Sequence, residues 1–179
     1  MERSIKERNI LDKFCEEFCK RVEKHTVYII VSGFLVIASG RTRGTEDIDM
    51  IIPRIEKEKF MRLHKELTEK FVCVQSDNPE EMYDDYLAQN LSVRYTYKDK
   101  PLPEMEIKLA KDMLDTYQLK TRRKIPLTGL DVWFSSIPMN IAFKEEYLKS
   151  QKDLEDAEHL RKVYEEEINE EEIKRIKEM

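Results

Sequence analysis

The feature that most constrains the fold is the alternation of short apolar runs with longer amphipathic segments along the chain. Residues 26–31 are a β-branched and aromatic run, and residues 48–52 are a second apolar run that ends at Pro53. Runs of this length and composition are typical of strands buried in a sheet. Residues 4–24 and 57–70 instead place apolar side chains at helical spacing. The alternation predicts a sheet domain of the α/β or α+β class, with the second strand beside the first.

The rest of the chain continues this pattern and ends in helices. We expect further strands at residues 71–74, 91–97, 105–109 and 131–134, and helices at residues 34–39, 138–150 and 153–167, followed by a charged terminal helix. The expected fold is therefore a mixed β-sheet flanked by helices, with a helical C-terminus. We divide the chain into a core with its N-terminal helix, residues 1–136, and C-terminal helices, residues 137–179, that pack on the core or extend from it.

Composition narrows the class of protein. A chain of 179 residues with 40% hydrophobic side chains predicts one domain with a substantial core, which excludes disorder throughout. The charged fraction is 39%, rich in Lys and Glu, with only 4 glycines. Hyperthermophile proteins have this bias, and we hypothesise a thermophilic source. The formal net charge of -5 argues against general binding of nucleic acid.

Membrane insertion is not expected. The longest apolar run, residues 26–40, is interrupted by Gly and Ser and is shorter than the roughly 20 residues that cross a bilayer. The first eight residues are charged and lack the apolar centre of a signal peptide. These features predict a cytoplasmic protein with reduced thiols and no membrane partner.

Two aspartates at the start of the second strand are the first candidate site. Asp47 and Asp49 are two residues apart, so on a strand they project from the same face. Two adjacent carboxylates repel each other, and a hard divalent cation with oxygen ligands would cancel that repulsion. The spacing favours a metal site, and the alternative is a solvated junction between a loop and a strand.

The segment upstream suggests a phosphate site next to that metal. The first strand ends at Ser32 and Gly33, where a short helix begins, and a loop containing Arg43 and Thr45 then leads to the aspartates. Backbone N–H groups at a helix start bind anions, and glycine allows a phosphate to come close. Adjacent phosphate and metal sites are what phosphoryl-type transfer requires.

These segments resemble the motif of the DNA polymerase beta-like nucleotidyltransferase superfamily. Ser32-Gly33 ends a strand, and Arg43-Gly44-Thr45-Glu46-Asp47-Ile48-Asp49 follows a short helix. The resemblance implies the nucleotidyltransferase fold and two Mg²⁺ ions held by the aspartates. It also implies that a nucleoside triphosphate, such as ATP, is bound by Ser32, Gly33, Arg43 and Thr45. Ser32 stands where the superfamily usually has its first glycine.

The superfamily has a third metal-binding carboxylate on a later strand, and the resemblance points to Glu106. Glu104 is the competitor, because strand alternation places Glu104, Glu106 and Lys108 on one face. Glu106 lies between Met105 and Ile107, deeper in the predicted strand. In the alternative interpretation, Glu106 is only the solvated side of an edge strand.

A second segment also resembles known proteins. Lys144, followed by Lys152-Asp153-Leu154-Glu155-Asp156, is similar to a segment of small nucleotidyltransferase proteins related to abortive-infection and toxin-antitoxin systems. The resemblance implies that Lys144 contacts the nucleotide phosphates and that Asp153 and Asp156 support the site. Alternatively, the segment is a helix with one apolar stripe and charges opposite.

The sequence thus favours a Mg²⁺-dependent enzyme that transfers a nucleoside monophosphate from the triphosphate to an acceptor and releases pyrophosphate. The acceptor is left open between an RNA end, a protein and a small molecule. The basic residues 120–124, with Tyr117 and Trp133 nearby, suit RNA contact, although a solvated charge run is the simpler explanation. The alternatives are a catalytically inactive relative that binds nucleotide or a protein partner, and a structural module. No serine-hydrolase elbow or Walker loop occurs.

Overall fold

One mixed sheet of seven strands forms the centre of the computed structural model, which describes residues 5–31, 33–40 and 47–179. The strand order is β3-β4-β5-β2-β1-β7-β6. The central strands β1 (Ile29–Val31) and β2 (Asp47–Ile52) pair antiparallel, whereas β2 and β5 (Glu104–Leu109) pair parallel. The other strands are β3 (Phe71–Cys73), β4 (Val93–Tyr97), β6 (Arg123–Lys124) and β7 (Trp133–Phe134). The predicted mixed sheet, with β2 beside β1, is confirmed.

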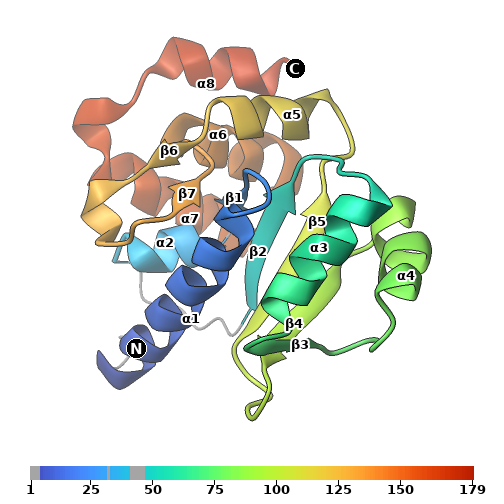
Figure 1. Cartoon of the computed structure of the whole chain (residues 1–179). Helices are drawn as coiled ribbons and strands as arrows, with labels where there is room; N and C mark the ends of the chain where they lie inside the picture. Colours follow the sequence, from blue (N-terminus) through green and yellow to red (C-terminus); the bar gives the residue numbers. More distant parts are fainter. Residues whose placement is uncertain (1–4, 32, 41–46) are drawn as a thin grey trace.

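Two helices, α1 (Ile5–Glu23) and α3 (Lys57–Leu67), cover one face of this sheet and contact each other (Figure 1). Phe14 and Phe18 of α1 are fully buried, and their rings lie 5.7 and 4.9 Å from the ring of Phe71. Burial of each such side chain stabilises the fold by about 1.5–3 kcal/mol. The helical spacing of apolar residues therefore predicts both helices correctly.

A buried polar pair lies within this apolar layer. The Nδ1 atom of His64 on α3 is 2.8 Å from the hydroxyl of Tyr95 on β4, and burial lowers the pKa of His64 from its usual 6.5. We expect Tyr95→Phe to cost about 1–3 kcal/mol, because a buried nitrogen loses its partner. Protonation of His64 is disfavoured in the fold, so the free energy of unfolding should fall as pH drops below about 6.5. Urea unfolding of both proteins between pH 5 and 8 measures this, and an identical wild-type stability at pH 5 and 8 would contradict it.

The opposite face of the sheet carries a smaller apolar cluster. Ile29, Ile51 and Ala110 pack there with Leu119 from helix α5 (Met113–Lys120). The Asp112 side chain accepts a hydrogen bond from the Asp115 backbone N–H at 2.9 Å and so caps this helix. No sequence pattern predicts a helix at α5, because the apolar residues of this segment do not form a clear stripe.

The C-terminal helices pack together at the end of the sheet formed by β1, β7 and β6 (Figure 1). Helix α6 (Ile137–Ala142) continues into the π-helical turn η4 (Phe143–Leu148), and α7 (Gln151–Val163) and α8 (Glu170–Lys177) follow. Helix α7 contacts α2 (Gly33–Ala38). The predicted terminal helices are confirmed, whereas a domain division after residue 136 stays a prediction.

Five short elements complete the described part of the chain. They are α4 (Pro79–Glu81), η1 (Met82–Tyr86), η2 (Leu87–Gln89), η3 (Pro126–Thr128) and η5 (Glu165–Glu167). Among the residues that the structure describes, no helix is both long enough and apolar enough to span a membrane.

An ion-pair cluster joins η4, α7 and α8. Glu145 accepts hydrogen bonds from Arg161 Nε at 2.7 Å and Lys177 Nζ at 2.7 Å, and these partners lower the pKa of Glu145 to about 2. We expect Glu145→Gln to cost about 1–2 kcal/mol after solvent screening. This stabilisation is present above pH 4.5 and is lost as pH falls toward 2. Thermal unfolding should therefore show the largest deficit of the variant at neutral pH and convergence with wild type near pH 2; a constant deficit would contradict the account.

Candidate active site

Two cross-strand pairs of carboxylates lie on one face of the sheet. In the parallel pairing of β2 with β5, Asp47 is opposite Glu104 and Asp49 is opposite Glu106. Their neighbours Ile48 and Met50 point into the core beneath α1 and α3, so alternation directs the carboxylates to the other face. Strand alternation predicts one face for Asp47 and Asp49 and one face for Glu104 and Glu106, and the register of β2 with β5 places these two pairs opposite each other.

The second pair is in direct contact. Burial, a hydrogen bond with Glu106 and the charge of Glu106 together raise the pKa of Asp49 to about 7, and the Lys108 ammonium opposes that rise. Two carboxylates form such a contact only if one holds a proton or a cation neutralises them. The pair is therefore suited to a positive ligand.

Glu104 differs from Glu106 in its surroundings. Its carboxylate is 3.9 Å from the Arg94 guanidinium on β4, which is the neighbouring strand in the sheet. Burial raises the pKa of Glu104 above its usual value, Asp47 raises it further, and Arg94 acts in the opposite direction. Glu104 thus has a cationic partner in the fold, whereas Glu106 contacts Asp49.

A cavity of about 210 Å³ adjoins Asp49 on this face. Strand residues Val31 and Lys108 form part of its wall, and Asn140 and Lys144 from the α6–η4 helix form another part. The structure therefore brings Asp49 and Lys144, which are far apart in sequence, to the same cavity.

Lys144 is held in place by two aspartates. Its side chain is 2% exposed, and its Nζ atom lies 3.2 Å from Asp156 Oδ2 and 3.8 Å from Asp153 Oδ1. Asp156 is fully buried, and neither aspartate lines the cavity. The three residues of the second predicted segment are thus brought together, with Lys144 between the aspartates and the cavity.

A buried polar network fixes further residues of the cavity wall. Gln118 Oε1 accepts a hydrogen bond from the Ser135 hydroxyl at 3.0 Å, and Asn140 Nδ2 donates to the Ser135 carbonyl at 2.9 Å. Asp115 accepts from the Lys111 backbone N–H at 3.0 Å. Sequence reasoning missed these cavity residues, because α5 was not predicted and the amide side chains belong to no motif. Lys108 is the exception, because strand alternation places it on the same face as Glu106.

The predicted phosphate residues can be placed only in part. Ser32, Arg43 and Thr45 lie outside the described residues. Gly33 begins α2 as predicted, two residues after Val31, and Val31 is the β1 partner of Asp49. The start of α2 therefore follows the strand that lies beside the carboxylates.

The basic segment near Trp133 is occupied by contacts within the chain. The Arg122 guanidinium and the Lys124 ammonium each lie 5.0 Å from the centre of the Trp133 ring, and Lys124 pairs with Asp131 at 2.8 Å. Cation–π contacts of this kind stabilise the ring in place. RNA contact through this segment stays a prediction.

The carboxylate oxygens of Asp49 and Glu106 suit a hard cation, although the described side chains do not form a complete metal site. No group of three or more His, Cys, Asp or Glu residues within residues 5–31, 33–40 and 47–179 is arranged to hold a metal ion. The contact between Asp49 and Glu106 nevertheless supplies two oxygen donors of the type that Mg²⁺ prefers.

Comparison with solved structures defines the class of fold as nucleotidyltransferase-like. A nucleotidyltransferase-like protein from Paracoccidioides brasiliensis matches 98% of this chain and 88% of its own, with a TM-score of 0.58 and 17% identity. The antibiotic-resistance factor ANT(2'')-Ia matches 96% of this chain and 91% of its own, with a TM-score of 0.56 and 14% identity. JHP933 from Helicobacter pylori matches 94% of this chain and 72% of its own, with a TM-score of 0.54 and 18% identity.

The likeness lies in structure and not in sequence. No protein-family model and no curated protein sequence matches this chain. At identities of 14% to 18% the comparison shows the fold, which confirms the fold expected from the resemblance.

Proposed function

We propose that this chain is a Mg²⁺-dependent nucleotidyltransferase that moves a nucleoside monophosphate from a nucleoside triphosphate to an acceptor and releases pyrophosphate. The observation that carries the proposal is the contact between Asp49 and Glu106 on a sheet of this fold, next to a cavity that Lys144 also lines. Because one fold can host many activities, the proposal depends on the chemistry of these site residues.

Asp47, Asp49 and Glu106 are the proposed holders of two Mg²⁺ ions. A cation removes the repulsion within the Asp49–Glu106 pair, and carboxylate oxygens are suitable ligands. Mg²⁺, when bound, neutralises charge on the transferring phosphoryl group.

The chain's own residues orient the triphosphate for displacement. An acceptor oxygen forms a bond to the α-phosphorus, the bond from that phosphorus to the bridging oxygen breaks, and its electron pair leaves with pyrophosphate. The proton of the acceptor passes to solvent. We propose that Ser32, Gly33 and Thr45 donate hydrogen bonds to the phosphates, and that Arg43 balances their negative charge.

Lys144 is the proposed cation on the other side of the cavity. Its ammonium is already desolvated, because the side chain is 2% exposed, and Asp153 and Asp156 fix its position. A preorganised buried charge interacts with developing phosphate charge more strongly than a mobile surface lysine does. Asp153 and Asp156 act in this proposal as positioning residues.

The size of the cavity limits which part of a substrate enters it. Its volume of about 210 Å³ is below the range of about 300–1,000 Å³ that encloses drug-sized ligands. We propose that it receives one base, one sugar ring or the reactive end of a longer acceptor. RNA, protein and small-molecule acceptors are each compatible with this size.

Glu104 and Glu106 provide a paired test of the third metal ligand. We expect Glu106→Gln to lower Mg²⁺-dependent pyrophosphate release by about 10²-fold or more, because it removes a proposed metal oxygen. Glu104→Gln, the matched control two residues away, should retain most of the activity. The measurement is pyrophosphate release from each nucleoside triphosphate in the presence of RNA, protein and small-molecule acceptors. Loss in Glu104→Gln with retention in Glu106→Gln would transfer the role to Glu104.

The pyrophosphate-release assay also distinguishes the proposed nucleotidyltransferase from a catalytically inactive protein of the same fold. A catalytically inactive protein of this fold would bind nucleotide or a protein partner and release no pyrophosphate with any acceptor. Metal-dependent nucleotide binding without turnover would therefore favour the inactive alternative over the proposed enzyme.

A further inference from the structure

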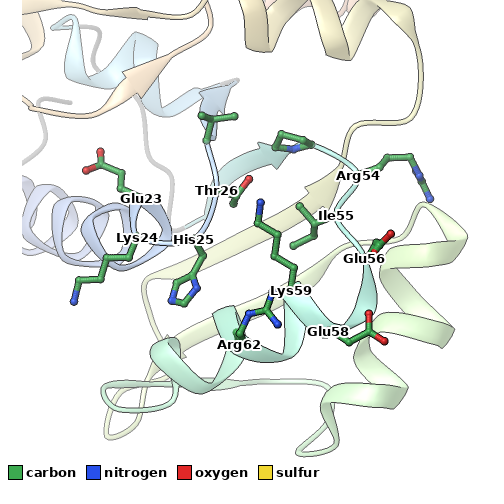
Figure 2. A pocket seen from close by; sticks show the side chains of 12 residues that line it. Glu23, Lys24, His25, Thr26, Arg54, Ile55, Glu56, Glu58, Lys59 and Arg62 are labelled. Carbon is green, nitrogen blue, oxygen red and sulfur yellow. The ribbon is translucent and has the colours of Figure 1, made fainter.

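A second concave surface lies at the other end of β2 from Asp47. A groove of about 700 Å³ opens between the chain that joins α1 to β1 and the beginning of α3. Its wall includes His25, Lys59 and Arg62 (Figure 2). Pro53, which directly follows β2, lines the groove, so at about 3.3 Å per residue the groove begins roughly 13 Å along the strand from Asp49 and roughly 20 Å from Asp47.

Three basic side chains line this groove. Figure 2 shows Lys59 extending from α3 toward Thr26 of the α1–β1 connection, with Arg62 lower on α3 and His25 pointing down from the facing wall. Within the part of the chain that the structure describes, neither Lys59 nor Arg62 forms an ion pair. Lys59 and Arg62 are three positions apart on α3, so they are neighbours on one face of the helix, and like charges placed in this way repel unless an anion lies between them.

The acidic residues around the groove do not neutralise these side chains. Glu23 accepts a hydrogen bond from the Tyr28 hydroxyl at 2.9 Å, and Figure 2 shows Glu56 and Glu58 directed away from Lys59. Glu66 is 3.7 Å from His25, but it also binds Arg21 at 3.1 Å. Within the described residues, these carboxylates therefore do not pair with Lys59 or Arg62, and both cations are available to a ligand.

From this geometry we propose that the groove binds a phosphate group, held by Lys59 and Arg62 with His25 as a third contact. An Arg guanidinium and a Lys ammonium are the side chains that recognise phosphate oxygens best. At about 700 Å³ the groove also has room for the nucleoside attached to that phosphate. The phosphate belongs to a free nucleotide or to a nucleic-acid strand.

Binding in the absence of Mg²⁺ tests the groove independently of the proposed reaction. The probes are inorganic phosphate, a nucleoside monophosphate and a labelled ten-nucleotide single-stranded RNA, measured by shifts of the His25 imidazole resonance and by fluorescence anisotropy. We expect Lys59→Gln/Arg62→Gln to weaken binding about tenfold. For RNA, loss of two phosphate contacts should also reduce the slope of log K against log salt by about 1.4.

Matched variants exclude a general charge effect and the catalytic site. Lys65→Gln/Lys174→Gln removes the same net charge from exposed positions outside the groove and should bind like wild type. Asp49→Asn should also leave phosphate binding unchanged, so failure of the proposed enzyme activity would not affect this result.

The probes then distinguish the two sources of phosphate. RNA that binds more than tenfold tighter than the monophosphate supports a strand, and comparable affinities support a free nucleotide. Equal binding by the groove variant and the matched variant, or binding of none of the probes, would overturn the proposal.

Discussion

Asp49→Asn is expected to lower nucleotidyl transfer by about 10³-fold or more while the protein stays folded. Asp49 occupies the centre of the proposed site, opposite Glu106 and in the wall of the cavity. The amide removes a charged metal ligand but nearly preserves the shape of the side chain. It also removes the like charge beside Glu106, so we expect no loss of thermal stability in the absence of metal.

The assay for this variant is pyrophosphate release at saturating Mg²⁺, with circular dichroism melting of the same samples. Asp99→Asn is a matched control, because Asp99 is an exposed carboxylate in the β4–β5 loop. Full activity in Asp49→Asn would contradict the catalytic assignment. A melting temperature far below wild type would instead show that Asp49 has a structural role.

Lys144→Met should produce the largest loss of stability. The ammonium of Lys144 lies 3.2 Å from the fully buried Asp156 carboxylate, and methionine removes this buried ion pair. Removing one member of a buried pair costs about 3–5 kcal/mol. For a chain of this size the melting temperature should fall by roughly 6–20 °C.

A double variant separates the structural and functional roles of Lys144. Lys144→Met/Asp156→Asn removes both charges, so it should recover most of the lost stability. Activity should stay low if Lys144 contacts the nucleotide phosphates as proposed. Recovery of both stability and activity would limit Lys144 to a structural role, and no destabilisation of the single variant would contradict the buried ion pair.

The parts of the fold that depend on regular periodicity could be predicted from the sequence. Phe14 and Phe18 lie one turn apart and mark the buried side of α1, and the apolar run before Pro53 marks β2. These signals are local, because burial on one face requires apolar residues at a fixed spacing. Helix α5 lacks such a stripe, and its position depends on Leu119 packing against Ile29 and Ile51.

The candidate site was predictable only where a motif or strand alternation placed its residues. Alternation puts Asp47 and Asp49 on one face, and the register of β2 with β5 then sets Glu106 opposite Asp49. That register is a long-range property, so sequence reasoning alone left Glu104 and Glu106 as competitors. Asn140 lines the cavity because of the way α6 packs against the sheet domain, and no local sequence pattern indicates that packing.

Nucleotide-dependent thermal stabilisation tests the central claim most directly. Each nucleoside triphosphate is added with and without Mg²⁺ to the wild type and to Asp47→Asn/Asp49→Asn. The account predicts that Mg²⁺ and nucleotide together raise the wild-type melting temperature and that the double variant loses this shift. An equal shift in both proteins, or no shift with any triphosphate, would contradict a metal-dependent nucleotide site at Asp47 and Asp49.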